Sequence, residues 1–188
     1  MTNHKILAIS GSLRADSHNT ALLRAAQKFS TGLEVVIYDG LREIPPYDQD
    51  LDNPVNRPAQ VNELRRLITE ADGLLIATPE FNYSIPGVLK NAIDWVSTDW
   101  TKTEGLPLLH KPVAIMGAAP TQFGSVRAQL ALRQVFVWTE SDIVVKPEVI
   151  AFRSHERFDA DGNLVDENTI ELLQGLLTAL TAKIDRVK

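Results

Sequence analysis

The segment KILAISGSLRADSHNT, residues 5–20, decides the fold class of this chain. Its first part, Lys5–Ser10, is apolar at nearly every position, which is typical of a β-strand covered on both faces. Gly11 ends the apolar run, a short loop rich in hydroxyl and amide side chains follows, and a helical pattern begins near Asn19. Strand, loop and helix N-terminus in this order are the arrangement with which α/β proteins hold a nucleotide phosphate.

The alternation of strand and helix continues through the 188 residues. Further strands are expected over residues 33–38, 73–78, 112–117 and 143–151, the last interrupted at Pro147. Helices are expected over residues 19–31, 58–71, 87–96 and 126–138, and an amphipathic stripe predicts a last helix over 170–187. Alternating elements imply a parallel sheet with helices on both faces. Five strands favour a single α/β domain over residues 1–188, a flavodoxin-like three-layer sandwich with the strand order 2-1-3-4-5.

Composition narrows the classes of partner and chemistry. The chain has no cysteine, which excludes disulfides, thiolate catalysis and cysteine metal sites. A net charge of −5 does not favour nucleic acid, whose binding proteins usually carry a basic face. The basic pair Arg65–Arg66 is interpreted as a solvated helix face. No apolar run is long enough to span a bilayer and no signal peptide is expected, so we expect a cytoplasmic protein with no membrane partner.

The loop after the first strand has the chemistry of a phosphate site. Ser12, Ser17, Asn19 and Thr20 offer side-chain hydrogen bonds, and the start of the helix adds unpaired N–H groups and the positive end of a dipole. Arg14 adds a guanidinium group suited to a phosphate. Neither GxxxxGK(S/T) nor GxGxxG is present, so a single terminal phosphate is favoured. The alternative is plain capping by Ser17 or Asn19, with Arg14 on the surface.

Two more loops follow strands whose carboxyl ends should share one edge of the sheet. The second, TPEFNYSIP at residues 78–86, could match the edge of a planar heterocycle, with Phe81 or Tyr83 covering the ring; the alternative is a turn with Phe81 in the core. The third, residues 117–125, could admit a flat ring because its residues are small; the alternative is a tight turn. The small residues are Ala118, Ala119, Gly124 and Ser125.

Together these motifs resemble the NADPH-dependent FMN reductase family, which includes bacterial quinone, chromate and azo-compound reductases. The matching segments are GSLRADSHNT at residues 11–20, TPEFNYSIPGVLKNAIDW at 78–95 and KPVAIMGAAPTQFGSVRAQLALRQ at 111–134. The resemblance covers nearly the whole chain in the right order and spacing. It implies a flavodoxin-like fold that holds FMN without a covalent bond.

The resemblance also implies which residues meet the FMN. Its phosphate would be bound by the first loop, with His18 contributing mainly through its main chain; the residues are Ser12, Arg14, Ser17, His18, Asn19 and Thr20. The isoalloxazine ring would lie against Pro79, Glu80, Phe81 and Asn82, with Glu80 as a positioning residue. The other side would be closed by Ala118, Ala119, Gly124 and Ser125. Phe81 stands where tyrosine is commoner in the family, and Ser125 where a second glycine is frequent.

The implied chemistry is that of the cofactor. NADPH or NADH, with NADPH favoured, would pass hydride to FMN, and a quinone, azo compound, metal oxyanion or free flavin would then accept electrons in the same place, giving ping-pong kinetics. No side chain is assigned a catalytic role and no metal site is expected. The family implies a homodimer or homotetramer. Two other classes stay open, a flavin-binding electron carrier and a small-nucleotide-binding protein without hydride transfer.

Overall fold

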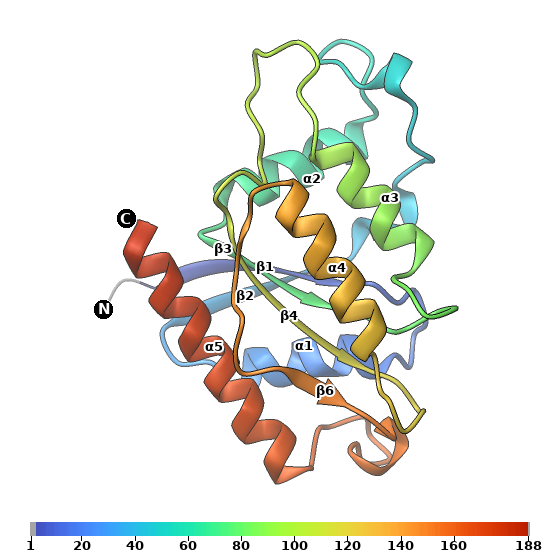
Figure 1. Ribbon diagram of the computed structural model, residues 1–188, viewed down its shortest axis with the longest axis vertical. Helices are drawn as coiled ribbons and strands as arrows, with labels where there is room; N and C mark the ends of the chain where they lie inside the picture. Colours follow the sequence, from blue (N-terminus) through green and yellow to red (C-terminus); the bar gives the residue numbers. More distant parts are fainter. Residues whose placement is uncertain (1–2, 188) are drawn as a thin grey trace.

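The computed structural model describes residues 3–187, and its centre is a parallel β-sheet (Figure 1). Neighbouring strands follow the order β2-β1-β3-β4-β5, and β6 also pairs with β4. The strands are β1 (His4–Ser10), β2 (Leu33–Tyr38), β3 (Gly73–Ala77), β4 (Pro112–Ala118), β5 (Asp142–Ile143) and β6 (Val149–Ala151). This confirms the predicted flavodoxin-like order 2-1-3-4-5.

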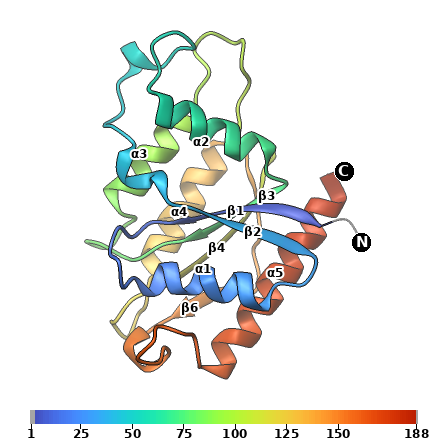
Figure 2. The ribbon, with the colours of Figure 1, turned by 180° about the vertical axis from the view of Figure 1, so that it is seen from behind.

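In the described part of the chain, five α-helices cover both faces of the sheet. They are α1 (His18–Phe29), α2 (Ala59–Glu70), α3 (Gly87–Val96), α4 (Val126–Trp138) and α5 (Glu167–Val187), with short 3-10 helices η1 (Gly40–Glu43), η2 (Gln49–Leu51) and η3 (Ser154–Glu156). One hydrophobic core lies between the sheet and α1 and α5, and a second lies between the sheet and α2, α3 and α4. Figures 1 and 2 show α1 and α2 on opposite sides of the sheet. Buried residues alternate between the two cores along β1, as a central strand requires.

The predicted fifth strand is two short strands. β5 pairs with the start of β4 and β6 pairs with its end, so both extend the same edge. Pro147 lies between them, and proline has no N–H to donate to a strand partner. The interruption predicted at Pro147 is therefore confirmed.

The sheet brings the three candidate loops to one edge. Ser10 at the end of β1 pairs with Ala77 at the end of β3, and Ala77 pairs with Met116 near the end of β4. All three strands are parallel, so the segments that follow them leave the sheet on the same side. This edge is the place where ligands bind in doubly wound folds.

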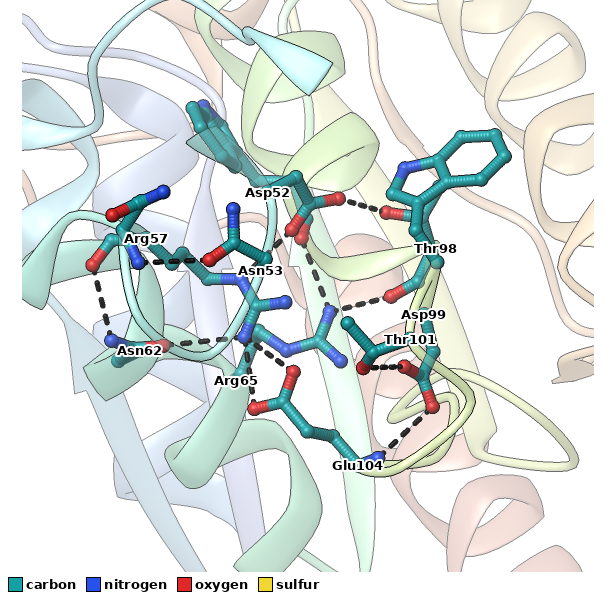
Figure 3. A network of polar contacts seen from close by, with 12 residues as sticks. Asp52, Asn53, Arg57, Asn62, Arg65, Thr98, Asp99, Thr101 and Glu104 are labelled. Atoms are coloured by element: carbon teal, nitrogen blue, oxygen red, sulfur yellow. Dashed lines mark hydrogen bonds and ion pairs between the residues drawn. The ribbon is translucent and has the colours of Figure 1, made fainter. Parts of the chain in front are cut away.

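Two long loops, residues 41–57 and 97–109, extend together beyond α2 and α3 in Figures 1 and 2 and are joined by a buried polar network (Figure 3). The Arg57 side chain is 1% exposed; its Nε donates to Asp52 Oδ1 at 2.8 Å and its Nη1 to Glu104 Oε2 at 2.8 Å. Asp52 also accepts a hydrogen bond from the Thr98 hydroxyl. The network holds one loop against the other.

Arg65 belongs to the same region, and its predicted solvated position is wrong. The residue is buried, and its guanidinium donates to the carbonyls of Trp95, Thr98 and Gly105 at 3.2, 2.9 and 3.1 Å. Only Arg66 lies at the surface, where it pairs with carboxylates one turn away on α2. The carbonyls at the end of α3 and in the following loop satisfy the buried charge of Arg65, and no local pattern in α2 reveals them.

Candidate functional site

Ser17 caps α1 at the base of the first loop. Its hydroxyl accepts from the main-chain N–H groups of Asn19 at 3.2 Å and Thr20 at 3.4 Å, as capping predicts. The Thr20 hydroxyl donates to Ser10 Oγ at 2.9 Å, which joins the helix to the end of β1. Within residues 3–187, several N–H groups of the loop donate to no protein acceptor; they belong to Leu13, Ala15, Asp16, Ser17 and His18. These donors, with the positive end of the α1 dipole, form a cup suited to an anion.

Arg14 and His18 differ in how they meet this cup. Arg14 is exposed, so its guanidinium is free to reach a bound anion. The His18 ring stacks on Phe158 with centroids 4.5 Å apart, and its Nδ1 lies 2.8 Å from the Ser154 hydroxyl. Burial, and to a smaller extent the electrostatic effect of Arg14 and of His155, lowers the pKa of His18. The neutral form of His18 is therefore favoured, and its ring is held by the segment around η3.

Asn19 connects the first loop to the third. Its side chain is buried, its amide nitrogen donates to the Ala118 carbonyl at 3.0 Å, and its amide oxygen accepts from the Ala118 N–H at 2.9 Å. Both polar atoms of the side chain are thus engaged with β4. The arrangement makes Asn19 a brace between α1 and β4, and the phosphate contact implied by the resemblance stays a prediction.

The second loop contains a β-hairpin with a two-residue turn, Phe81–Ser84, which we call the tip hairpin. Phe81 and Ser84 exchange two main-chain hydrogen bonds of 3.0 Å, and the central residues have positive φ angles, 50° at Asn82 and 66° at Tyr83. Positive φ at both positions defines a type I′ turn, which asparagine accepts more easily than tyrosine. The side chain of Phe81 is at the surface, with 52% of the residue exposed, so the alternative that places it in the core is wrong.

Glu80 caps α4 across the edge of the sheet. Its carboxylate accepts from the main-chain N–H groups of Arg127 at 2.9 Å and Ala128 at 3.3 Å, and it pairs with Arg127 Nη1 at 2.6 Å. The residue in the N-cap position, Ser125, makes no capping bond; its buried hydroxyl accepts from Gln129 Nε2 at 3.2 Å. Glu80 therefore supplies the cap from the second loop, a contact that joins it to the third loop.

Arg127 was missed at the level of sequence. Its guanidinium lies 4.0 Å from the centroid of the Tyr83 ring and 4.8 Å from that of Phe123, distances typical of cation–π contacts. The signal that could have found it is its position, because an arginine in the first turn of a helix opposes the helix dipole. Such a residue is expected to have an acidic partner, and here the partner is Glu80.

The small residues of the third loop pack inward. Gly124 has a φ of 58°, and a side chain there would collide with Ile150 of β6, so this glycine is required by the sheet and helix packing. Ala118, Ala119 and Ser125 are all buried. The exposed part of the loop is residues 120–123. The surface that the loop presents at this edge thus comes from residues that the sequence did not single out, Phe123 among them.

Comparison with known proteins matches these features to one family. A family model described as NADPH-dependent FMN reductase matches residues 4–156, a range that contains all three loops. Over 185 residues the chain is 42% identical to an NAD(P)H-dependent FMN reductase of Pseudomonas aeruginosa, covering 98% of this chain and 97% of that protein. Over 186 residues it is 37% identical to a quinone reductase of Escherichia coli, covering 98% and 97% of the two chains.

A solved structure extends the likeness to the fold. FerB of Paracoccus denitrificans, described as a flavoenzyme NAD(P)H:(acceptor) oxidoreductase, superposes with a TM-score of 0.85 at 32% sequence identity. The match covers 97% of this chain and 98% of that one. The whole described fold, and not only the loops, is therefore similar to that of a flavoenzyme.

Proposed function

This chain belongs to the NADPH-dependent FMN reductase family, and we propose that it binds FMN at the carboxyl edge of its sheet and reduces it with NAD(P)H. The observation that carries the proposal is the cup at the start of α1. Its N–H groups without a protein acceptor, the dipole of α1 and the exposed Arg14 offer what a phosphomonoester dianion needs. The donor set therefore fits the phosphate of FMN.

The ring of FMN is assigned to the second loop in the same proposal. Pro79, Glu80, Phe81 and Asn82 follow β3 directly, and the tip hairpin holds the main chain of this segment in one conformation. Bound FMN would supply the redox chemistry between a nicotinamide and an electron acceptor. The chain contributes position and electrostatics: the cup binds the phosphate, Glu80 is fixed by its hydrogen bonds to α4, and Phe81 and Tyr83 are exposed beside the ring segment.

A quinone is the acceptor that we propose first. The relatives include the quinone reductase of Escherichia coli and a 2-hydroxy-1,4-benzoquinone reductase of a Burkholderia species, which is 36% identical and covers 95% of this chain and 94% of that protein. Azo compounds, metal oxyanions and free flavin are further proposed acceptors. Nicotinamide and acceptor would occupy one place in turn, which gives ping-pong kinetics, and NADPH is proposed as the preferred donor.

Self-association is part of the proposal. Leu130, Val137 and Trp138 on α4 are 56%, 70% and 85% exposed, an apolar surface suited to a second copy of the chain. We propose a homodimer or homotetramer, which sedimentation of the purified protein would test. A monomer at micromolar concentration would contradict this assembly and leave the flavin chemistry unaffected.

The central experiment is a titration of the purified protein with FMN, followed by anaerobic mixing with NADPH or NADH. We expect one FMN per chain and rapid bleaching of the flavin absorbance. Absence of FMN binding at micromolar concentration would overturn the proposed function. A flavin that binds but is bleached by neither nicotinamide would favour the electron carrier. Parallel double-reciprocal plots with a quinone as second substrate would support the ping-pong order.

A further inference from the structure

The Glu80–Arg127 ion pair joins two loops that follow different strands. The pair is 2.6 Å long, the Glu80 side chain is 8% exposed, and that of Arg127 is 32% exposed. The carboxylate is also held by the main-chain N–H groups of Arg127 and Ala128. Charges that are partly shielded from water have a stronger electrostatic effect on neighbouring groups than charges in open solvent, because they are less screened.

The tip hairpin depends on outside support. Tyr83 has a φ of 66°, a backbone conformation that is unfavourable for a residue with a bulky side chain. Arg127 covers its ring at 4.0 Å and contacts Phe123 at 4.8 Å on the third loop. Since Glu80 immediately precedes the hairpin, Arg127 contacts this segment at two points, the carboxylate of Glu80 and the ring of Tyr83.

We propose that Arg127 is a positioning residue, which holds the tip hairpin against the N-terminus of α4, and that the charges of Arg127 and Glu80 shift the reduction potential of bound FMN in opposite directions. The second part rests on the proposed function, which lays the flavin ring against residues 79–82. Reduced flavin carries more negative charge than oxidised flavin, so a nearby cation stabilises the reduced form and a nearby anion destabilises it.

The positioning role is tested on the protein without FMN. Chymotrypsin cleaves after aromatic residues, and Phe81 and Tyr83 are both exposed. Below the unfolding temperature of every variant, we expect Arg127→Met to raise cleavage after Phe81 and Tyr83 several-fold, measured by mass spectrometry against cleavage after Trp100 in the same sample. Arg127→Lys keeps the ion pair but loses the planar stacking, so it should restore protection only in part.

Arg66→Met is the matched control for this measurement. It removes an arginine that is likewise ion-paired, to Glu63 and Glu70, but on the exposed face of α2, and it should leave cleavage at the hairpin unchanged. Equal cleavage of the wild-type and Arg127→Met proteins at the hairpin would overturn the positioning role. An equal rise in cleavage after Trp100 and after the hairpin residues would also overturn it, because it would indicate that the whole protein had become more accessible to the protease.

The charge effect is tested by redox titration of the FMN-loaded protein. Arg127→Met leaves the Glu80 charge unpaired and should lower the reduction potential, whereas Glu80→Gln leaves the Arg127 charge unpaired and should raise it. The double variant should return close to the wild-type potential, although the hairpin stays loose. Shifts in one direction, or none in either single variant, would overturn the charge effect. Failure of the wild type to bind FMN would count against the proposed function, and the cleavage experiment would still decide the positioning role.

Discussion

The side-chain amide of Asn19 both donates to and accepts from the main chain of Ala118, at 3.0 and 2.9 Å. The two contacts join the first turn of α1 to the last residue of β4, between residues 99 positions apart. They fix where the anion cup stands relative to the third loop. An amide that pairs with the main chain in the way that a neighbouring β-strand does has a structural role. Substitution of Asn19 measures this role through the stability of the protein, independently of phosphate binding.

Asn19→Leu should destabilise the fold. It leaves the N–H and C=O of Ala118 buried without their partners, at about 1–3 kcal/mol for each unpaired group. Equilibrium unfolding in urea measures the loss. Asn19→Asp keeps the acceptor but sets a buried carboxylate against the carbonyl oxygen of Ala118, so its loss at pH 7 should be at least as large. A stability of Asn19→Leu equal to that of the wild type would mean that the brace contributes nothing.

Arg57→Met should cost far more stability than Arg66→Met. The Arg57 side chain is 1% exposed and its loss leaves Asp52 buried with an uncompensated charge, which costs about 3–5 kcal/mol. The Arg66 side chain is 51% exposed, and surface ion pairs contribute about 0–1 kcal/mol. Urea unfolding of both variants checks the contrast. Similar losses in the two would show that the buried network does not hold the loops.

Asp99 should make stability depend on pH in the acid range. Desolvation raises its pKa, but hydrogen bonds from the N–H groups of Gly105 and Glu104 outweigh this and lower the pKa to about 2. The folded pKa lies below the unfolded value of about 4, so the contribution is complete above pH 4 and is lost as the pH falls toward 2. Thermal unfolding should therefore show the wild type more stable than Asp99→Asn at about pH 5, and this difference in stability should shrink as the pH falls to about 2. A constant difference would contradict the assignment.

Arg14→Ala should weaken FMN binding by about 1–3 kcal/mol, the range for a lost hydrogen bond to a charged group. That range corresponds to a rise in Kd of about 5- to 150-fold. Arg24→Ala is the control, because Arg24 is also exposed but lies beyond the first turn of α1. Fluorescence titration with FMN gives both constants. Equal retention of FMN by wild type and Arg14→Ala would remove Arg14 from the cup.

Two substitutions of Asn82 distinguish the effect of its backbone conformation from the effect of its side-chain amide. Asn82→Gly preserves the positive φ of 50° without strain, whereas Asn82→Ala should cost about 1 kcal/mol in stability because alanine tolerates this conformation poorly. Both variants lose the amide, so both should alter the absorption spectrum of bound FMN while changing phosphate affinity little. Native spectra in both would take the Asn82 side chain out of the flavin site.

Much of the fold follows from local pattern alone. The apolar run of β1 indicates a strand buried on both faces, Ser17 stands where a helix N-cap is expected, and Pro147 interrupts the last strand. These features depend on residues close together in the sequence. Periodicity, capping and the missing N–H of proline act within a few positions, so the order of strands and helices can be predicted from them.

The candidate site could be predicted only in outline. Three loops at one edge follow from the alternation of strands and helices, but the contacts between the loops do not. Arg65 is buried because carbonyls 30 to 40 positions away accept its hydrogen bonds, and Glu80 caps a helix 47 positions further on. Phe81 is exposed in a hairpin whose preceding residue, Glu80, is paired with Arg127 of α4, a residue distant in sequence.

The sequence by itself therefore determined the α/β order and the family, and it predicted the first loop as an anion cup. Only the tertiary structure decided which polar side chains remain free for a ligand and which serve the fold. The physical reason is that a buried polar group must find a partner wherever the folded chain supplies one. For Asn19 that partner is Ala118 and for Glu80 it is the start of α4, and both choices arise from the meeting of strands distant in sequence.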